Sequence, residues 1–205
     1  MRATARRVFF LLEATMPGLD DATREMAGEL LEAERDVLKC FQVLNEKMFS
    51  AMKIRIHGDY HLAKLLHTGR DFIITDFEGE PGRSMGERRI KRSPLRDVAV
   101  MIRSFHCAAH SQLVANNGRI RSEDAAFLEP WAELWYRHSA GCFLESYLAT
   151  VEGADFFPHD REELKSLLDI FIIDRAVYEL GDVLDNRPEW ITIPIRAIMA
   201  VLAER

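Results

Sequence analysis

The chain has 205 residues, 48% of them hydrophobic, which is enough for one compact domain with a buried core. Its net charge of −6 argues against a nucleic-acid surface, because such surfaces carry a clustered positive excess. There is no leading signal and no apolar run long enough to span a membrane, and the three cysteines are widely spaced without a Cys-x-x-Cys pair. We therefore expect a cytoplasmic protein with free, buried or semi-buried thiols.

The first 50 residues have helical periodicity. Residues 3–14 predict a short helix that ends at Pro17-Gly18. Asp20 or Asp21 is expected to cap a second helix, and apolar residues then recur at helical spacing as far as Met48. We expect one long amphipathic helix that packs beneath the segment that follows.

Residues 53–83 have the pattern of a phosphotransferase catalytic loop followed by a metal-binding turn. Lys53–Ile56 alternates polar and apolar residues and Phe72–Ile74 is apolar and β-branched, so both predict short strands. A tight turn at Thr68–Asp71 and a strand on either side of it would form a hairpin.

An acid follows each of the two strands predicted at Lys53–Ile56 and Phe72–Ile74. Phosphoryl transfer to an alcohol needs one carboxylate to orient the hydroxyl and take its proton, and another to hold magnesium. Asp59 fits the first role and Asp76 the second, with Glu78 as a second metal ligand or a substrate contact. His57 is expected to brace the loop backbone, and His61 to contact the substrate or to bridge the loop to Asp76.

The rest of the chain predicts further helices. One begins near Ser93-Pro94, with Ser93 as a plausible cap. After a polar loop at 115–124, a helix dense in aromatic residues runs from about residue 123 to Thr150. Another begins at Asp160 and ends at 186–188, and a last short helix covers about 194–203.

The catalytic stretch carries a family resemblance. His57-Gly-Asp59-x-His61 followed by Asp76-Phe-Glu78 resembles the signature of the aminoglycoside-phosphotransferase-like kinases, which are related to the protein kinases. Residues 76–81, 87–99, 103–106, 176–181 and 186–190 together resemble the maltokinases, so that the likeness covers nearly the whole chain. It implies transfer of the γ-phosphate of ATP, with Mg2+, to the anomeric hydroxyl of maltose or a related disaccharide. In some organisms such a domain is fused to a trehalose synthase.

The resemblance implies a mainly α (α+β) fold, that of a protein-kinase-like C-terminal lobe in which a small β-hairpin carries the catalytic loop. It places the whole chain in one such lobe, with a helical segment at 1–52, the catalytic loop and hairpin at 53–85 and a helical substrate-binding part at 86–205. Before Lys53 there is no glycine-rich phosphate loop and no Val-Ala-x-Lys-like strand. We therefore expect this chain to lack the N-terminal ATP lobe and, on its own, not to transfer phosphate.

One position close to Asp59 departs from the pattern of the resembled kinases. Five residues after it, where the resembled kinases have Asn or Gln, this chain has Lys64, and an ammonium offers no lone pair to a metal. Lys64 either supplies a fixed positive charge near the phosphates or marks a weakened activity. Asp97 lies where the resembled kinases have an acid that supports the catalytic loop.

Aromatic residues at helical spacing are expected mostly in the core. Sugars also stack on aromatic faces and bond to planar polar groups, which gives the following candidates for a disaccharide pocket: Trp135, Tyr136, Arg137, Tyr178, Glu179 and Arg187. We predict no zinc site, because we find no metal-ligand spacing among the other histidines: His67, His106, His110, His138 and His159.

Two rival functions remain open. Lys64 and the missing ATP lobe favour a catalytically degenerate module that binds sugar or assembles with a trehalose synthase. A kinase for another alcohol, such as an amino sugar or choline, is disfavoured by residues 78–103, which resemble the maltokinases.

Overall fold

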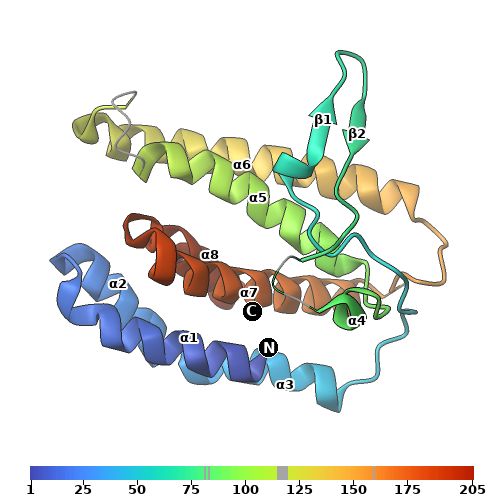
Figure 1. Cartoon of the computed structure of the whole chain (residues 1–205), viewed down its shortest axis with the longest axis horizontal. Helices are drawn as coiled ribbons and strands as arrows, with labels where there is room; N and C mark the ends of the chain where they lie inside the picture. Colours follow the sequence, from blue (N-terminus) through green and yellow to red (C-terminus); the bar gives the residue numbers. More distant parts are fainter. Residues whose placement is uncertain (81, 83, 115–119, 159) are drawn as a thin grey trace.

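The chain folds into a helical bundle with a two-stranded hairpin projecting at one end (Figure 1). The computed structural model describes residues 1–80, 82, 84–114, 120–158 and 160–205. Half of the predicted 115–124 loop and His159 lie outside the described residues. None of the helices in the described ranges is long and apolar enough to cross a membrane.

The helices form three layers, and α7 (Arg161–Asn186) lies in the middle layer, where it packs against helices on both sides (Figure 1). One layer is the antiparallel pair α5 (Leu95–Val114) and α6 (Ser122–Thr150), and α7 shares the middle layer with α8 (Thr192–Ala203). The third layer contains α1 (Arg2–Thr15) and the two helices that follow it. Large side chains that are almost completely buried come from every layer: Leu12, Leu30, Leu95, Met101, Ile170, Ile173, Leu180, Ile195 and Ile198.

The long helix expected after Asp20 is in fact two helices, α2 (Asp21–Glu32) and α3 (Glu34–Glu46). Ala33, between them, has φ −80° and ψ 0°, a conformation that interrupts the helix. Asp20 caps α2 as predicted, since its carboxylate accepts a hydrogen bond from the backbone N–H of Thr23 at 3.0 Å. The expectation that this segment packs beneath the hairpin is wrong: α2 and α3 contact α1, α7 and α8, and the hairpin projects from the opposite side of the bundle (Figure 1).

Other helix starts follow their local signals, with one exception. Asp160 caps α7 by accepting hydrogen bonds from the backbone N–H groups of Glu162 and Glu163. α5 begins next to Pro94 as predicted, but the Ser93 hydroxyl is buried without a hydrogen-bond partner, so Ser93 is not the expected cap. The short helices η1 (Met16–Gly18), η2 (Leu62–Lys64), α4 (Met85–Arg88) and η3 (Pro188–Trp190) connect the larger elements.

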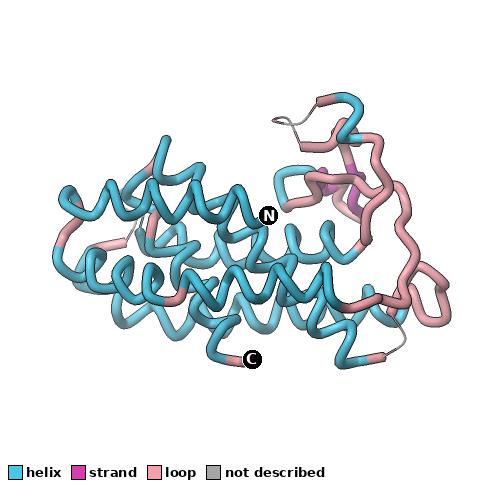
Figure 2. The backbone as a smooth tube through the Cα atoms, turned by 90° about the horizontal axis from the view of Figure 1, so that it is seen from below, coloured by secondary structure: helices cyan, strands magenta, loops and turns pink. Residues whose placement is uncertain are grey.

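The hairpin consists of β1 (Leu65–His67) and β2 (Phe72–Ile74), paired antiparallel. The predicted turn is present, with the backbone N–H of Thr68 donating to the carbonyl of Asp71 at 2.8 Å. Gly69 within it has φ +91°, which glycine adopts without strain. Figure 2 shows that the strands and most of the loops lie at one end of the bundle.

The strand expected at Lys53–Ile56 is wrong. Only Ile54 pairs there, in an isolated bridge in which it exchanges two backbone hydrogen bonds with Arg92. One bridged residue pair is too short to be a β-strand. After Ile54 the chain continues directly into the loop that carries Asp59.

Two sets of side chains differ from expectation in their burial. Of the α6 aromatic residues expected in the core, Phe127, Trp131 and Trp135 are exposed (73%, 62% and 49%). Cys40 is buried and Cys107 is half-buried, but Cys142 is exposed, and all three thiols are free.

Candidate active site

The loop that carries Asp59 is fixed to the first turn of α5. The carboxylate of Asp97 accepts hydrogen bonds from the backbone N–H groups of His57, at 2.7 Å, and Gly58, at 2.9 Å. Burial raises the pKa of Asp97, and these two N–H groups act in the opposite direction. Gly58 has φ +85°, and a Cβ there would lie 3.3 Å from the Cα of Gly79, so the turn requires glycine.

His57 connects this loop to the hairpin. Its Nε2 lies 2.8 Å from the carbonyl oxygen of Thr75, at the end of β2, and its Nδ1 lies 3.3 Å from the backbone nitrogen of Asp59. Since a carbonyl can only accept, Nε2 carries the proton and Nδ1 is the acceptor. The ring therefore holds the segments of Asp59 and Asp76 at a fixed separation.

Asp59 is nearly buried and lies among three cationic or polar side chains. His61 Nε2 is 3.5 Å and Lys64 Nζ is 4.0 Å from its Oδ2, and Arg175 Nη1 is 3.9 Å from its Oδ1. Burial alone would raise the pKa of Asp59, but the hydrogen bond and charge of His61, with the charges of Arg175 and Lys64, outweigh it, and the pKa is lowered. Asp59 is therefore ionised at neutral pH.

Asp76 lies on the other side of Lys64. Lys64 Nζ is 2.9 Å from Asp76 Oδ2, and this hydrogen bond is the main cause of the raised pKa of Lys64. Asp76 has φ 60°, an uncommon and strained conformation for a residue other than glycine. The exposed Glu78 adds negative charge that also raises the pKa of Lys64. Lys64 thus lies between the two acids that the sequence singled out.

A cavity of about 610 Å3 opens beside the loop, and its lining includes His61, Arg175, Glu179 and Arg187. Glu179 and Arg187 are two of the six residues expected to line a sugar pocket. Tyr178 lines an adjoining cavity of about 210 Å3, which also contains Gly58 and Arg175.

The other three candidate sugar contacts belong to α6. Tyr136 and Arg137 line a separate cavity, whose lining does not include Asp59 or His61. Trp135 packs edge-on against Phe105, with 6.3 Å between ring centroids. The structure therefore does not bring these three residues to the catalytic loop.

Arg175 was missed by the sequence analysis. It lies close to Asp59, donates from Nε to Glu179 at 3.1 Å, and its guanidinium lies 5.1 Å from the centre of the Tyr178 ring. A signal was present, because Arg175 lies among the apolar residues of α7 one helical turn before Glu179.

Glu179 is held from two sides. Besides Arg175, it accepts hydrogen bonds at 3.0 and 2.7 Å from Arg103, whose side chain is only 1% exposed. The Ser104 hydroxyl next to Arg103 accepts a hydrogen bond from the backbone N–H of Leu62 at 3.0 Å. Through these contacts α5 positions both Glu179 and the segment that follows Asp59.

Solved structures of glucosamine kinases share this fold. A glucosamine kinase in complex with glucosamine, ADP and inorganic phosphate superposes with a TM-score of 0.72, covering 99% of this chain and 47% of that chain at 19% identity. Two other crystal forms of glucosamine kinase give the same TM-score and identity.

The curated proteins with similar sequences are also glucosamine kinases. The chain is 33% identical over 91 residues to a glucosamine kinase of Mycolicibacterium smegmatis, covering 44% of this chain and 22% of that protein. It is 25% identical over 155 residues to a glucosamine kinase of Streptacidiphilus jiangxiensis, covering 74% of this chain and 32% of that protein. The chain thus spans less than a third of either relative, and no family model matches it.

Proposed function

We propose that this chain is the acceptor-side lobe of a sugar kinase, which transfers the γ-phosphate of ATP to a sugar hydroxyl. The observation that carries the proposal is the position of Asp59, an ionised carboxylate next to the Lys64–Asp76 pair. It lies on a loop that Asp97 fixes and whose residues Gly58 and His61 line two cavities. A carboxylate in that state can orient a hydroxyl and accept its proton as the oxygen attacks phosphorus.

The same cluster supplies groups for the phosphates. Asp76 and Glu78 offer the carboxylate oxygens that Mg2+ prefers, and Lys64 offers none. Bound there, Mg2+ would neutralise phosphate charge. Lys64 and Arg175 add two fixed cations within 4.0 Å of Asp59, which favours negative charge that develops on a transferred phosphoryl group.

The cavity beside the loop is the proposed sugar pocket. Its lining includes Trp190, whose ring stacks with the Arg187 guanidinium at 5.1 Å, and the exposed carboxylate of Asp182. An amino sugar would place its ammonium against such an acid, so we propose glucosamine, the substrate named for the relatives, as the first sugar to test. Maltose, expected from the sequence resemblance, is the second.

We further propose that ATP binds between this chain and a second lobe. The solved glucosamine kinases are about twice as long as the part that this chain matches. The exposed apolar side chains of the hairpin, among them Leu66, Phe72 and Ile73, are the surface that such a lobe would cover.

A second candidate function is a sugar-binding module without transfer activity, with a trehalose synthase as one partner for assembly. The Lys64–Asp76 ion pair favours it, because it occupies an oxygen that Mg2+ would need.

The test uses the longest natural chain that contains this segment, with ATP, Mg2+ and either glucosamine or maltose. Asp59→Asn should lower the transfer rate about 10²- to 10⁴-fold, the usual contribution of a general base. Asp21→Asn, on the exposed start of α2, is the control and should leave the rate unchanged. Sugar binding without transfer by the unmodified chain would favour the second candidate and contradict the first.

A further inference from the structure

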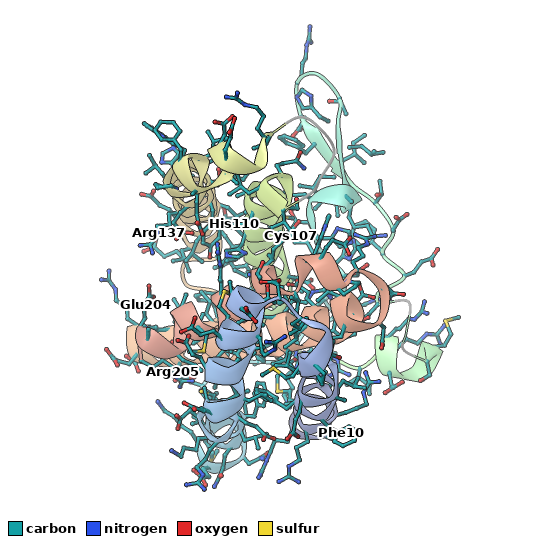
Figure 3. All side chains as sticks on the ribbon, turned by 90° about the vertical axis from the view of Figure 1, so that its left-hand side faces the viewer. Phe10, Cys107, His110, Arg137, Glu204 and Arg205 are labelled. Atoms are coloured by element: carbon teal, nitrogen blue, oxygen red, sulfur yellow. The ribbon has the colours of Figure 1, made fainter. Side chains whose placement is uncertain are left out.

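A second cluster of polar side chains lies in a cavity of about 620 Å3 whose lining comes from α5, α6, α7 and α8. Within it, His106, His110 and Glu133 present ligand atoms that all lie within 4.8 Å of one another. Figure 3 labels His110 together with Arg137 and Glu204, which line the same cavity from other parts of the chain. This cluster takes no part in the proposed transfer reaction.

The helix geometry explains the grouping. His106 and His110 are four residues apart on α5, so their side chains share one face, and their ring centroids are 4.3 Å apart. Glu133 reaches them from α6, with its Oε2 3.3 Å from His110 Nε2. The sequence expectation that these histidines lack metal-ligand spacing is wrong for this pair, because a separation of four on a helix is such a spacing.

Both imidazoles are buried, with 6% of His106 and 5% of His110 exposed. The Nδ1 atoms of His106 and His110 are buried without a hydrogen-bond partner, which is rare for such groups.

Two of the three arginines that line the cavity pair with acids of the same lining. Arg137 Nε donates to Glu133 Oε1 at 2.5 Å, and Arg196 pairs with Glu129. Arg103 is bound to Glu179 outside the cavity. Asp169 and Glu204 add two more acids to the lining. The acids of the lining offset part of this arginine charge, and Glu133 keeps its Oε2 directed at His110.

We propose that His106, His110 and Glu133 bind a transition-metal ion such as Zn2+ and thereby join α5 to α6. Two imidazole nitrogens and one carboxylate oxygen form a common zinc ligand set, which leaves a fourth position open to the cavity. With zinc bonds of about 2.0–2.1 Å, the ligand atoms of a tetrahedral site lie roughly 3.3 Å apart. Side-chain rotations that move the ligand atoms by about 1–2 Å would therefore complete the site. Since Asp97 and Ser104 on the same helix hold the catalytic loop, the ion would act as a structural clamp on α5.

The test titrates the chain, first stripped with a chelator, with Co2+ and then with Zn2+, in the presence of excess Mg2+. We expect one ion per chain, a visible Co2+ absorption band typical of four- or five-coordinate sites, and a higher midpoint of thermal unfolding. His106→Ala and Glu133→Gln should each weaken binding at least tenfold. Glu133→Gln preserves side-chain shape and keeps the test valid if the histidine variant does not fold.

His67→Ala is the matched control, because His67 is an exposed histidine in the hairpin, and it should bind the ion as the unmodified chain does. The proposal is overturned if the unmodified chain binds neither ion, or if His106→Ala, Glu133→Gln and His67→Ala all bind with the same affinity. Retention of binding in Asp76→Asn would separate this site from the proposed magnesium position.

Discussion

The ammonium of Lys64 lies 2.9 Å from the carboxylate of Asp76, at the position where the resembled kinases carry an amide that binds magnesium. A cation in that place both neutralises the acid and competes with a metal for it. We therefore expect this ion pair to distinguish the two functions proposed above, transfer of phosphate and sugar binding alone.

Replacing Lys64 by glutamine should increase the affinity for Mg2+. The change removes the competing ammonium and supplies an oxygen ligand, and we expect a gain of about tenfold, equivalent to ~1.4 kcal/mol. Calorimetric titration with Mg2+ measures it. Lys39→Gln is the control, since Lys39 also pairs with an aspartate, Asp36, but on the surface of α3. Equal affinities in all three proteins would contradict the proposed magnesium position.

Asp97→Ala should destabilise the catalytic loop. The substitution leaves the backbone N–H groups of His57 and Gly58 without their acceptor, at a cost of about 1–3 kcal/mol each if they stay dry. Hydrogen exchange of residues 57–59 should accelerate more than that of the α7 core. If exchange at the loop is unchanged, Asp97 does not hold it.

Arg103→Met should lower the free energy of unfolding by about 3–5 kcal/mol, because it removes one partner of a buried ion pair and leaves Glu179 with Arg175 alone. Urea unfolding measures the loss. The control is Arg121→Met, whose exposed pair with Asp124 should contribute less than about 1 kcal/mol. Similar losses in both variants would show that the buried pair carries no special weight.

Stability should fall as the pH is lowered below 6.5, in part through His106. Burial, with the nearby Arg103 charge, lowers its pKa from 6.5 to about 2, so between these values the unfolded chain binds a proton that the folded chain does not. Each pH unit in this window removes up to ~1.4 kcal/mol of unfolding free energy. With chelator present, His106→Gln should lose less stability than the unmodified chain between pH 7.5 and 5.5, and equal losses would contradict the assignment.

Local signals in the sequence predicted much of the fold. The cap at Asp160, the start of α5 beside Pro94 and the glycine turn at Gly69 each depend on a few neighbouring residues, and each is present. The break at Ala33 was missed because apolar residues keep their helical spacing on both sides of it. Periodicity reports which face is apolar and does not show where an axis is interrupted.

Tertiary proximity accounts for the rest. The neighbours of Asp59 within its own loop, His61 and Lys64, were visible in the sequence, but Arg175 comes from a helix more than a hundred residues later. Glu133 reaches His110 only because α6 packs antiparallel to α5. The exposure of Trp131 could not be predicted either, since it depends on which face of α6 has a neighbour.

The hairpin affects how this chain associates in solution. In the described part of the chain β1 and β2 form a sheet of two strands, so the outer edge of each strand has no neighbouring strand and lies next to exposed apolar side chains. Such edges pair readily with strands of other molecules. Unless another chain covers these edges, we expect the folded chain to form oligomers through edge-to-edge pairing. The oligomers should increase with protein concentration at temperatures well below the unfolding temperature.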